Sequence, residues 1–151
     1  MNMDFKLQKK LVKRAMKEAE KAIKKWNSPF GAIITDANGN IIIKAYNTVN
    51  SDMNPTAHAE INAIKKACKK LASKNLSAYY LISNAESCPM CMTAAIKAKI
   101  THFIFGAPTE RDSDPYITVH NIAKHSKQEL TIQTGVLGKE CSEQIAAARN
   151  W

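Results

Sequence analysis

The part of this sequence best suited to catalysis is a set of three residues of types that bind zinc, with a carboxylate close to the first of them. They are His58, Cys88 and Cys91, the last two within Cys88-Pro89-Met90-Cys91. Imidazole and thiolate are preferred Zn²⁺ ligands, and three protein ligands leave open the fourth tetrahedral position that catalytic sites use. A zinc ion lowers the pKa of water in that position from about 15.7 toward 7. Glu60, two residues after His58, is placed to move protons there without binding the metal.

Each half of this pattern has ordinary alternatives when taken alone. A C-x-x-C can be redox-active, half of a zinc ribbon, or two helix-end cysteines. A histidine in an alanine-rich helix often only packs. The two halves together, in this order and each at an expected helix start, match the signature H-x-E followed by P-C-x-x-C of zinc-dependent deaminases. The sequence therefore predicts a catalytic site with one Zn²⁺ per chain.

Length and composition predict a globular protein. The 151 residues are enough to bury a core as one domain over residues 1–151. No stretch approaches the roughly 18 apolar residues of a membrane span, and the polar, lysine-bearing residues 1–10 are no secretory signal. Cys68 and Cys141 remain as buried thiols, which favours a reducing compartment, and we expect a cytoplasmic location.

The net charge of +9 is concentrated in two lysine-rich stretches, residues 6–25 and 65–74. Such a field can attract nucleic acid or a phosphorylated substrate. It can also be a solvated face that keeps a protein soluble. Aromatic side chains, on which bases would stack, are not interleaved with these lysines. We therefore favour the solvated face.

The first half of the chain predicts a helix, a hairpin and a second helix. Residues 3–26 repeat apolar side chains at three- and four-residue steps as far as Trp26, which predicts an amphipathic helix. Residues 30–35 and 41–46 flank a turn and predict an antiparallel hairpin. A polar loop over 48–55 then leads to a helix over 56–72. That helix is expected to carry His58 and Glu60 in its first turn.

The second half predicts alternating strands and helices. The expected strands are 77–83, 101–105 and 130–134, and the expected helices are 88–99, 119–125 and 139–149. Residues 108–115 form a polar loop with three acids, Glu110, Asp112 and Asp114. This order predicts an α/β protein, a three-layer α/β/α sandwich around a mixed sheet of about five strands. His102, His120 and His125 have no motif around them and are interpreted as ordinary loop or strand-end histidines, one of which could lie near the mouth of the pocket.

Over residues 26–145 the sequence resembles the cytidine deaminase superfamily. The matching pieces are Phe30-Gly31-Ala32, Asn47, residues 55–60, residues 86–91 and Phe105-Gly106. The resemblance implies the same sandwich fold and the hydrolytic removal of an exocyclic amine from a nucleobase, with release of ammonia. It implies that His58, Cys88 and Cys91 bind zinc, that Glu60 shuttles protons, and that the protein is a homodimer.

Within the superfamily, residues 28–32, 47–60 and 63–68 are similar to bacterial guanine deaminases. This similarity implies that Asn47 hydrogen-bonds the base. Phe30, the backbone near Ala32 and residues near Ala57 would line the pocket, and an acid of the 108–115 loop, Asp114 or Asp112, would help proton transfer. Asn47 could instead be a turn residue at a strand end, and the two aspartates could belong to a solvated loop.

Two departures separate the chain from that group. Ser87 stands where the family has a proline before the first cysteine ligand, and residues 134–141 are similar to the end of bacterial tRNA adenosine deaminases. We therefore carry three hypotheses. The first is a zinc-dependent hydrolase acting on C–N bonds of cyclic amidines, with a small free nucleobase or nucleoside, guanine foremost, as substrate. The second is a tRNA-specific adenosine deaminase, whose partner is tRNA. The third is a zinc-stabilised domain without activity.

Overall fold

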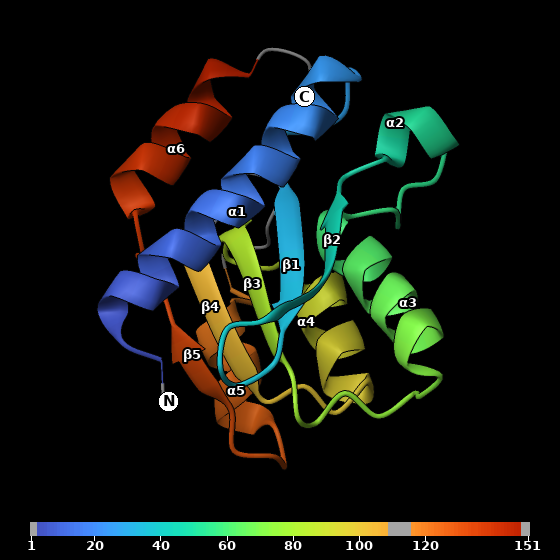
Figure 1. The fold of residues 1–151 in the computed structure, drawn as a ribbon, viewed down its shortest axis with the longest axis vertical. Helices are drawn as coiled ribbons and strands as arrows, with labels where there is room; N and C mark the ends of the chain where they lie inside the picture. Colours follow the sequence, from blue (N-terminus) through green and yellow to red (C-terminus); the bar gives the residue numbers. More distant parts are fainter. Residues whose placement is uncertain (1–2, 109–115, 149–151) are drawn as a thin grey trace.

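The computed structural model describes residues 3–108 and 116–148, and a five-stranded sheet lies at its centre (Figure 1). The strands are β1 (Gly31–Thr35), β2 (Ile41–Tyr46), β3 (Tyr80–Ala85), β4 (His102–Ala107) and β5 (Thr131–Gln133), in the spatial order β2-β1-β3-β4-β5. β1 is antiparallel to both β2 and β3, whereas β3, β4 and β5 run parallel. The predicted hairpin and the predicted mixed sheet of about five strands are confirmed.

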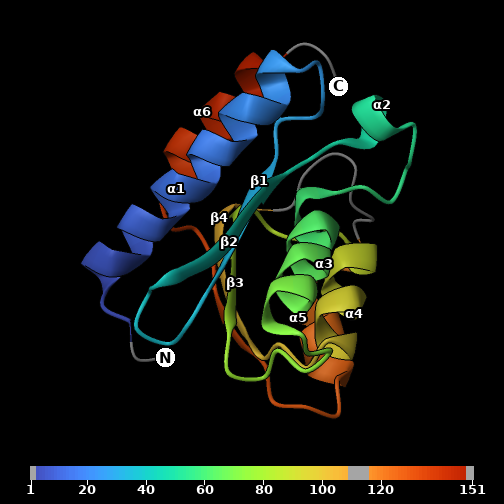
Figure 2. The same cartoon turned by 45° about the vertical axis from the view of Figure 1, so that its right-hand side comes forward.

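Helices cover both faces of this sheet, as Figure 2 shows. Helices α1 (Phe5–Lys24) and α6 (Gly138–Ala147) lie on one face. Helices α3 (Ala59–Leu71), α4 (Pro89–Lys97) and α5 (Val119–His125) lie on the other. The predicted three-layer sandwich is therefore confirmed. No helix in the described ranges is both long enough and apolar enough to cross a membrane.

Two apolar cores form because successive strand residues point to opposite faces of the sheet. Ile33 and Ile82 pack with the residues under α1 and α6. Their neighbours Ile34 and Leu81 pack with Phe103 under α3, α4 and α5. All five side chains are fully buried. A sheet buried on both faces gives rigid support to the loops at its ends, where the candidate site lies.

The side chain of Asn84, near the end of β3, connects this strand to the start of β1 and to α6. This fully buried side chain accepts a hydrogen bond from the Gly31 N–H (3.0 Å) and donates to the carbonyl of Pro29 (3.0 Å) and to Gln144 of α6 (3.2 Å). Gly31 is the point where α1 lies closest to β1. A Cβ built there would stand 2.2 Å from the Ala15 carbonyl oxygen, so only glycine permits this approach.

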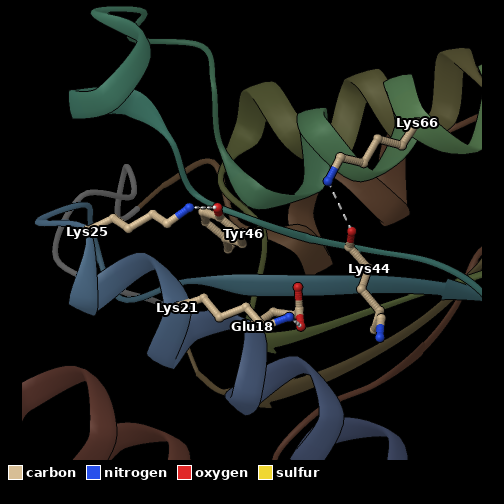
Figure 3. Close-up of polar contacts among 6 residues, drawn as sticks. All are labelled: Glu18, Lys21, Lys25, Lys44, Tyr46 and Lys66. Atoms are coloured by element: carbon tan, nitrogen blue, oxygen red, sulfur yellow. Dashed lines mark hydrogen bonds and ion pairs between the residues drawn. The ribbon is translucent and has the colours of Figure 1, made fainter.

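Side chains of α3 cover the outer edge of β2. Three residues one helical turn apart donate to alternate carbonyl oxygens of the strand: Asn62 to Tyr46 (2.9 Å), Lys66 to Lys44 (3.2 Å) and Lys70 to Ile42 (2.8 Å). Figure 3 shows Lys66 reaching Lys44 from the helix. An exposed strand edge is a template for pairing with another chain, and lysines are one of the devices that block it. Part of the lysine-rich charge therefore has a structural use.

The predicted start of the helix at residue 56 is wrong by three residues, because α3 begins at Ala59. The side-chain oxygen of Asn54 accepts hydrogen bonds from both the N–H (2.9 Å) and the hydroxyl (2.7 Å) of Thr56. This local turn competes with the helix for the same backbone groups. His58 therefore occupies the N-cap position of α3 instead of its first turn, whereas Glu60 does lie in the first turn.

The predicted polar loop 48–55 contains a short helix, α2 (Val49–Asp52), so that prediction is also wrong. No side chain within α2 or at its N-cap caps it. The side-chain oxygen of Asn27 instead accepts from the N–H groups of Asn50 and Ser51, both at 3.0 Å. Asn27, distant in sequence, thus satisfies two of the first-turn donors that a helix leaves unpaired, and the adjacent Asn47 satisfies that of Val49.

The predicted apolar stripe of the first helix fails most clearly at Trp26, which was expected to be its last buried residue. Helix α1 ends at Lys24, and Trp26 adopts a left-handed backbone conformation (φ 63°) with 75% of its surface exposed. The other predicted helices and strands occur, 41–46 and 119–125 with the predicted ends and the rest with their ends shifted. The largest shift at a strand start is that of β3, which begins at Tyr80 where 77 was expected. Cys141 is buried as predicted, whereas Cys68 is only half-buried.

Candidate zinc and active site

The structure brings His58, Cys88 and Cys91 together from two helices. Their ligand atoms all lie within 4.8 Å of one another. The Nδ1 atom of His58 is 3.5 Å from the Cys88 sulfur and 3.4 Å from the Cys91 sulfur. Zn–N and Zn–S bonds of about 2.05 and 2.3 Å at a tetrahedral angle separate nitrogen from sulfur by about 3.6 Å. The spacing of these donors therefore fits a zinc ion held by Nδ1 and two sulfurs.

Both halves of this group lie at helix N-termini. His58 is the N-cap of α3, and Cys88 is the N-cap of α4, which continues through Pro89 to Cys91 in its first turn. Neither N-cap side chain caps its own helix. The positive end of a helix stabilises nearby negative charge, which favours the thiolate form of a cysteine. The two helix N-termini thus bring three zinc ligands together and favour the negatively charged thiolate form in which cysteine binds zinc.

The two cysteines are linked by a hydrogen bond that shifts their pKa values in opposite directions. Accepting this bond from the Cys91 thiol, together with the nearby His58, lowers the pKa of Cys88 to about 4. Donating the bond, together with burial, raises the pKa of Cys91. Cysteine binds zinc as the thiolate, so a bound divalent cation would favour loss of the thiol protons from both sulfurs.

Glu60 lies beside this group on the first turn of α3, with only 5% of its surface exposed. Its Oε2 accepts a hydrogen bond of 2.8 Å from the Ser87 hydroxyl. Burial raises the pKa of the Glu60 carboxyl; His58 opposes this effect, the neighbouring Cys88 sulfur adds to it more weakly than His58 opposes it, and the Ser87 hydrogen bond lowers the pKa by less still. A carboxyl whose pKa is raised retains its proton to a higher pH than an ordinary glutamate, which suits it to proton transfer.

Three of the predicted substrate residues meet next to the zinc ligands. The N–H of Asn47 donates to the carbonyl of Phe30 (3.0 Å), and the N–H of Thr48 donates to the carbonyl of Ala57 (3.0 Å). Asn47 is only 2% exposed, and its Oδ1 accepts from the Val49 N–H in a turn. No residue in the described ranges accepts from its Nδ2. Oδ1 thus has the turn role, and the amide N–H₂ is available as a donor. Binding of substrate by these residues stays a prediction.

The other two predicted substrate residues are less informative. Ala32 is fully buried in the core under α3 and exposes no surface of its own. It pairs with Ala45 and Ser83 in the sheet. Its proposed place behind the pocket stays a prediction about the backbone. Asp114, with Asp112 and Glu110, lies outside the described residues.

Sequence reasoning missed a second set of polar contacts next to the site. The buried carboxylate of Glu86 accepts a 2.5 Å hydrogen bond from the Thr134 hydroxyl, and its Oε2 lies 3.8 Å from Nε2 of His120. These contacts tie the loop before Cys88 to α5 and to the segment after β5. The position of Glu86 close to a ligand was a signal in the sequence. Nothing local marked Thr134 or His120, and the sequence did not single out His120 as the histidine that could lie near the pocket.

Comparison with known families identifies the domain. Residues 6–107 match the family described as the cytidine and deoxycytidylate deaminase zinc-binding region. The chain belongs to this family. The predicted superfamily, the sandwich fold and the zinc cofactor are thereby confirmed. Membership also establishes the protein as a zinc-type deaminase, a hydrolase acting on C–N bonds.

Relatives of two kinds share this fold and its sequence pattern. The tRNA-specific adenosine deaminase of Bacillus subtilis (strain 168) is 33% identical over 138 residues, which cover 90% of this chain and 84% of that protein. The guanine deaminase of the same strain is 45% identical over 71 residues, which cover 47% of this chain and 45% of that protein. A solved tRNA:A34 deaminase structure superposes with a TM-score of 0.81 at 25% identity, covering 89% of this chain and 98% of that one.

Proposed function

We propose that this protein deaminates a small free nucleobase or nucleoside, with guanine foremost. Hydrolysis would replace the exocyclic amine by a carbonyl oxygen and release ammonia. The proposal extends to a cytoplasmic location, which rests on the reduced cysteines, and to a homodimer, which rests on resemblance alone. The proposal rests on the lack of basic side chains in the described segments around the site, and the proton chemistry of Glu60 supplies its mechanism.

The segments that carry or touch the site residues have no lysine or arginine among their described residues. These segments are 26–30, 47–60, 86–91, 116–120 and 134–137. Their described charged residues, Asp52, Glu60 and Glu86, are acidic. A nucleic acid is held mainly through its phosphates, which needs basic side chains around the site. A small uncharged base has no such need.

More than half of the lysines lie on α1 and α3, and several of these, together with Lys25 at the C-cap of α1, have partners. Lys25 donates to the Tyr46 hydroxyl (2.8 Å), and Lys21 lies 2.8 Å from the carboxylate of Glu18 (Figure 3). Lys66 and Lys70 cover the edge of β2. This distribution supports the interpretation of a solvated lysine face over that of a nucleic-acid surface.

Glu60 is the residue we assign to proton transfer. A zinc ion held by His58, Cys88 and Cys91 would supply a nucleophilic water at neutral pH. Glu60 accepts a proton from the attacking water and delivers it to the ring nitrogen next to the amine-bearing carbon. It then takes a second proton from the hydroxyl that the water has added to that carbon and passes it to the amine; the C–N bond breaks, ammonia leaves, and the carbonyl forms. Its raised pKa suits the carboxyl to both transfers.

Guanine is placed first because of the residues around Asn47 and His58. The guanine deaminase of Bacillus subtilis shares 45% identity with this chain over 71 residues. The amide N–H₂ of Asn47 is a donor within a residue only 2% exposed. A purine offers ring nitrogens and, in guanine, a carbonyl oxygen to such a donor. These features support the free purine as the substrate class.

The second candidate is deamination of adenosine in tRNA, which the extent of the alignments favours. The tRNA-specific adenosine deaminase of Bacillus subtilis is matched over 84% of its length, against 45% for the guanine deaminase. That reaction would require extrusion of the target base and phosphate contacts. Its activity would therefore fall steeply as salt rises.

The test is ammonia release by the zinc-loaded protein with a panel of free bases and nucleosides, in parallel with inosine formation in tRNA transcripts. Glu60→Gln is the control, because it keeps the volume and removes the titrating group. We expect turnover of a free purine that is lost in the control and changes little with added salt. Inosine formation in tRNA, suppressed by salt, with no turnover of the panel would overturn the proposal in favour of the second candidate.

A further inference from the structure

We propose that Ser87 is a positioning residue that holds the Glu60 carboxylate in its working orientation through its hydroxyl. This inference rests on the proposed deaminase function, because it assigns Ser87 a part in that reaction. It concerns the residue at which this chain departs from the proline of its family.

The contact between the two residues is short and shielded from water. The Ser87 hydroxyl donates to Oε2 of Glu60 at 2.8 Å, and the two residues are 4% and 5% exposed. Among the described residues, Ser87 supplies the one side-chain hydrogen bond to this carboxylate. A hydrogen bond to an ionised carboxylate is stronger than one between neutral groups, and water does not compete for it in a buried site.

The hydrogen bond also joins the two halves of the site. Glu60 belongs to the first turn of α3, and Ser87 directly precedes Cys88 at the start of α4. The two residues are 27 positions apart in sequence. Any relative shift of the two helix starts would change the placement of Glu60 with respect to the zinc ligands. The Ser87 hydroxyl opposes such a shift from the side of the cysteines.

Proline at this position could not make the contact. It has no hydroxyl, and its ring stiffens the loop by fixing the backbone angle φ. Serine gives up that stiffness, and in this chain a side-chain hydrogen bond to Glu60 takes its place. The hydrogen bond therefore restrains both the loop before Cys88 and the Glu60 carboxylate that we assign to proton transfer.

Loss of the hydroxyl should slow the chemical step and leave substrate binding almost unchanged. A glutamate side chain has considerable rotamer freedom, and proton transfer requires hydrogen-bond distance to the reacting atoms. For Ser87→Ala we expect kcat to fall about tenfold with KM within about twofold, the pattern of an interaction used in the transition state. Ser87→Thr keeps the hydroxyl and should stay within about threefold of the natural protein.

The matched control is Ser83→Ala. Ser83 is also buried, but its hydroxyl oxygen accepts only a 3.4 Å contact from the Ala85 N–H and does not contact Glu60. All variants should bind one zinc per chain, measured by metal analysis of the purified protein. The inference is overturned if Ser87→Ala keeps full kcat, if Ser87→Thr loses as much activity as Ser87→Ala, or if the loss in Ser87→Ala follows loss of zinc.

A measurement without catalysis separates this inference from the proposed function. Thermal unfolding of Ser87→Ala, Glu60→Ala and the double variant gives a double-mutant cycle. We expect the double variant to lose less stability than the two single losses combined. Coupling in this cycle with no turnover of any substrate would keep the contact and refute the proposed function. Turnover by the natural protein, with no coupling and full activity of Ser87→Ala, would refute the inference alone.

Discussion

The contact of α1 with β1 at Gly31 predicts a severe effect for the smallest possible substitution, Gly31→Ala. The added methyl carbon would lie 2.2 Å from the carbonyl oxygen of Ala15, 2.4 Å from the backbone nitrogen of Ala19 and 2.8 Å from Cβ of Glu18. None of these atoms is the end of a flexible side chain. The clash can be relieved only by moving the helix away from the sheet.

The size of the effect follows from that movement. Favourable contacts between heavy atoms begin near 3.5 Å, so the helix must withdraw by about 1.3 Å from its 2.2 Å approach. Ala15 and Ala19 are fully buried, and withdrawal would open space around both. Overpacking of this kind costs about 1–3 kcal/mol, and we expect about 3 kcal/mol here because backbone atoms obstruct. For a chain of this length that corresponds to a fall in Tm of about 6–12 °C.

The assay is thermal and urea unfolding of Gly31→Ala beside Gly138→Ala. At Gly138 the nearest atom to an added Cβ is the Gly106 carbonyl oxygen at 3.5 Å, an ordinary contact. Gly138 begins α6, where alanine has the better helix propensity, so the control should be neutral or more stable by up to about 1 kcal/mol. Equal stability of the two variants, or a loss below about 1 kcal/mol in Gly31→Ala, would refute the reasoning.

Three further predictions follow from the contacts of the fold. Asn84→Leu would leave the buried Gly31 N–H and two acceptors without their partner, and we expect a loss of about 3 kcal/mol in urea unfolding; a loss below about 1 kcal/mol would contradict it. Replacing Lys66 and Lys70 together by methionine would uncover the β2 carbonyls, and size-exclusion chromatography should then show concentration-dependent association beyond the assembly that the natural protein forms. Burial lowers the pKa of His102 in the folded state, so its contribution to stability is complete above about pH 6.5 and is lost as the pH falls below that value. His102→Phe, which can keep the stacking on Tyr80, should therefore lose less Tm than the natural protein between about pH 7 and pH 5; equal losses would disprove this.

The zinc group could be predicted from the sequence because coordination chemistry accepts few residue types. His58, Cys88 and Cys91 offer ligands that zinc prefers, and Glu60 is a carboxylate beside them. The order of helices and strands was predictable for a similar reason. Apolar periodicity is a property of short windows, and it survives into the fold as buried faces.

Competition between local and distant hydrogen bonds explains the errors. Helix α3 starts late because Asn54 holds the N–H of Thr56 in a turn. Helix α2 forms because Asn27, from another segment, caps it. Residues 49–52 and their N-cap, Thr48, carry no capping side-chain contact of their own.

The sequence by itself thus determined the ligand types, the carboxylate beside them, the alternation of elements and the sandwich they form. Only the tertiary structure decided that the Ser87 hydroxyl meets Glu60 and that Thr134 and His120 approach Glu86. Residue types and periodicity act within a few turns of chain. Contacts between residues 27 or 48 positions apart depend on how the sheet sets the helix starts and loops against each other. That arrangement comes from packing on both faces of the sheet, and no single segment contains it.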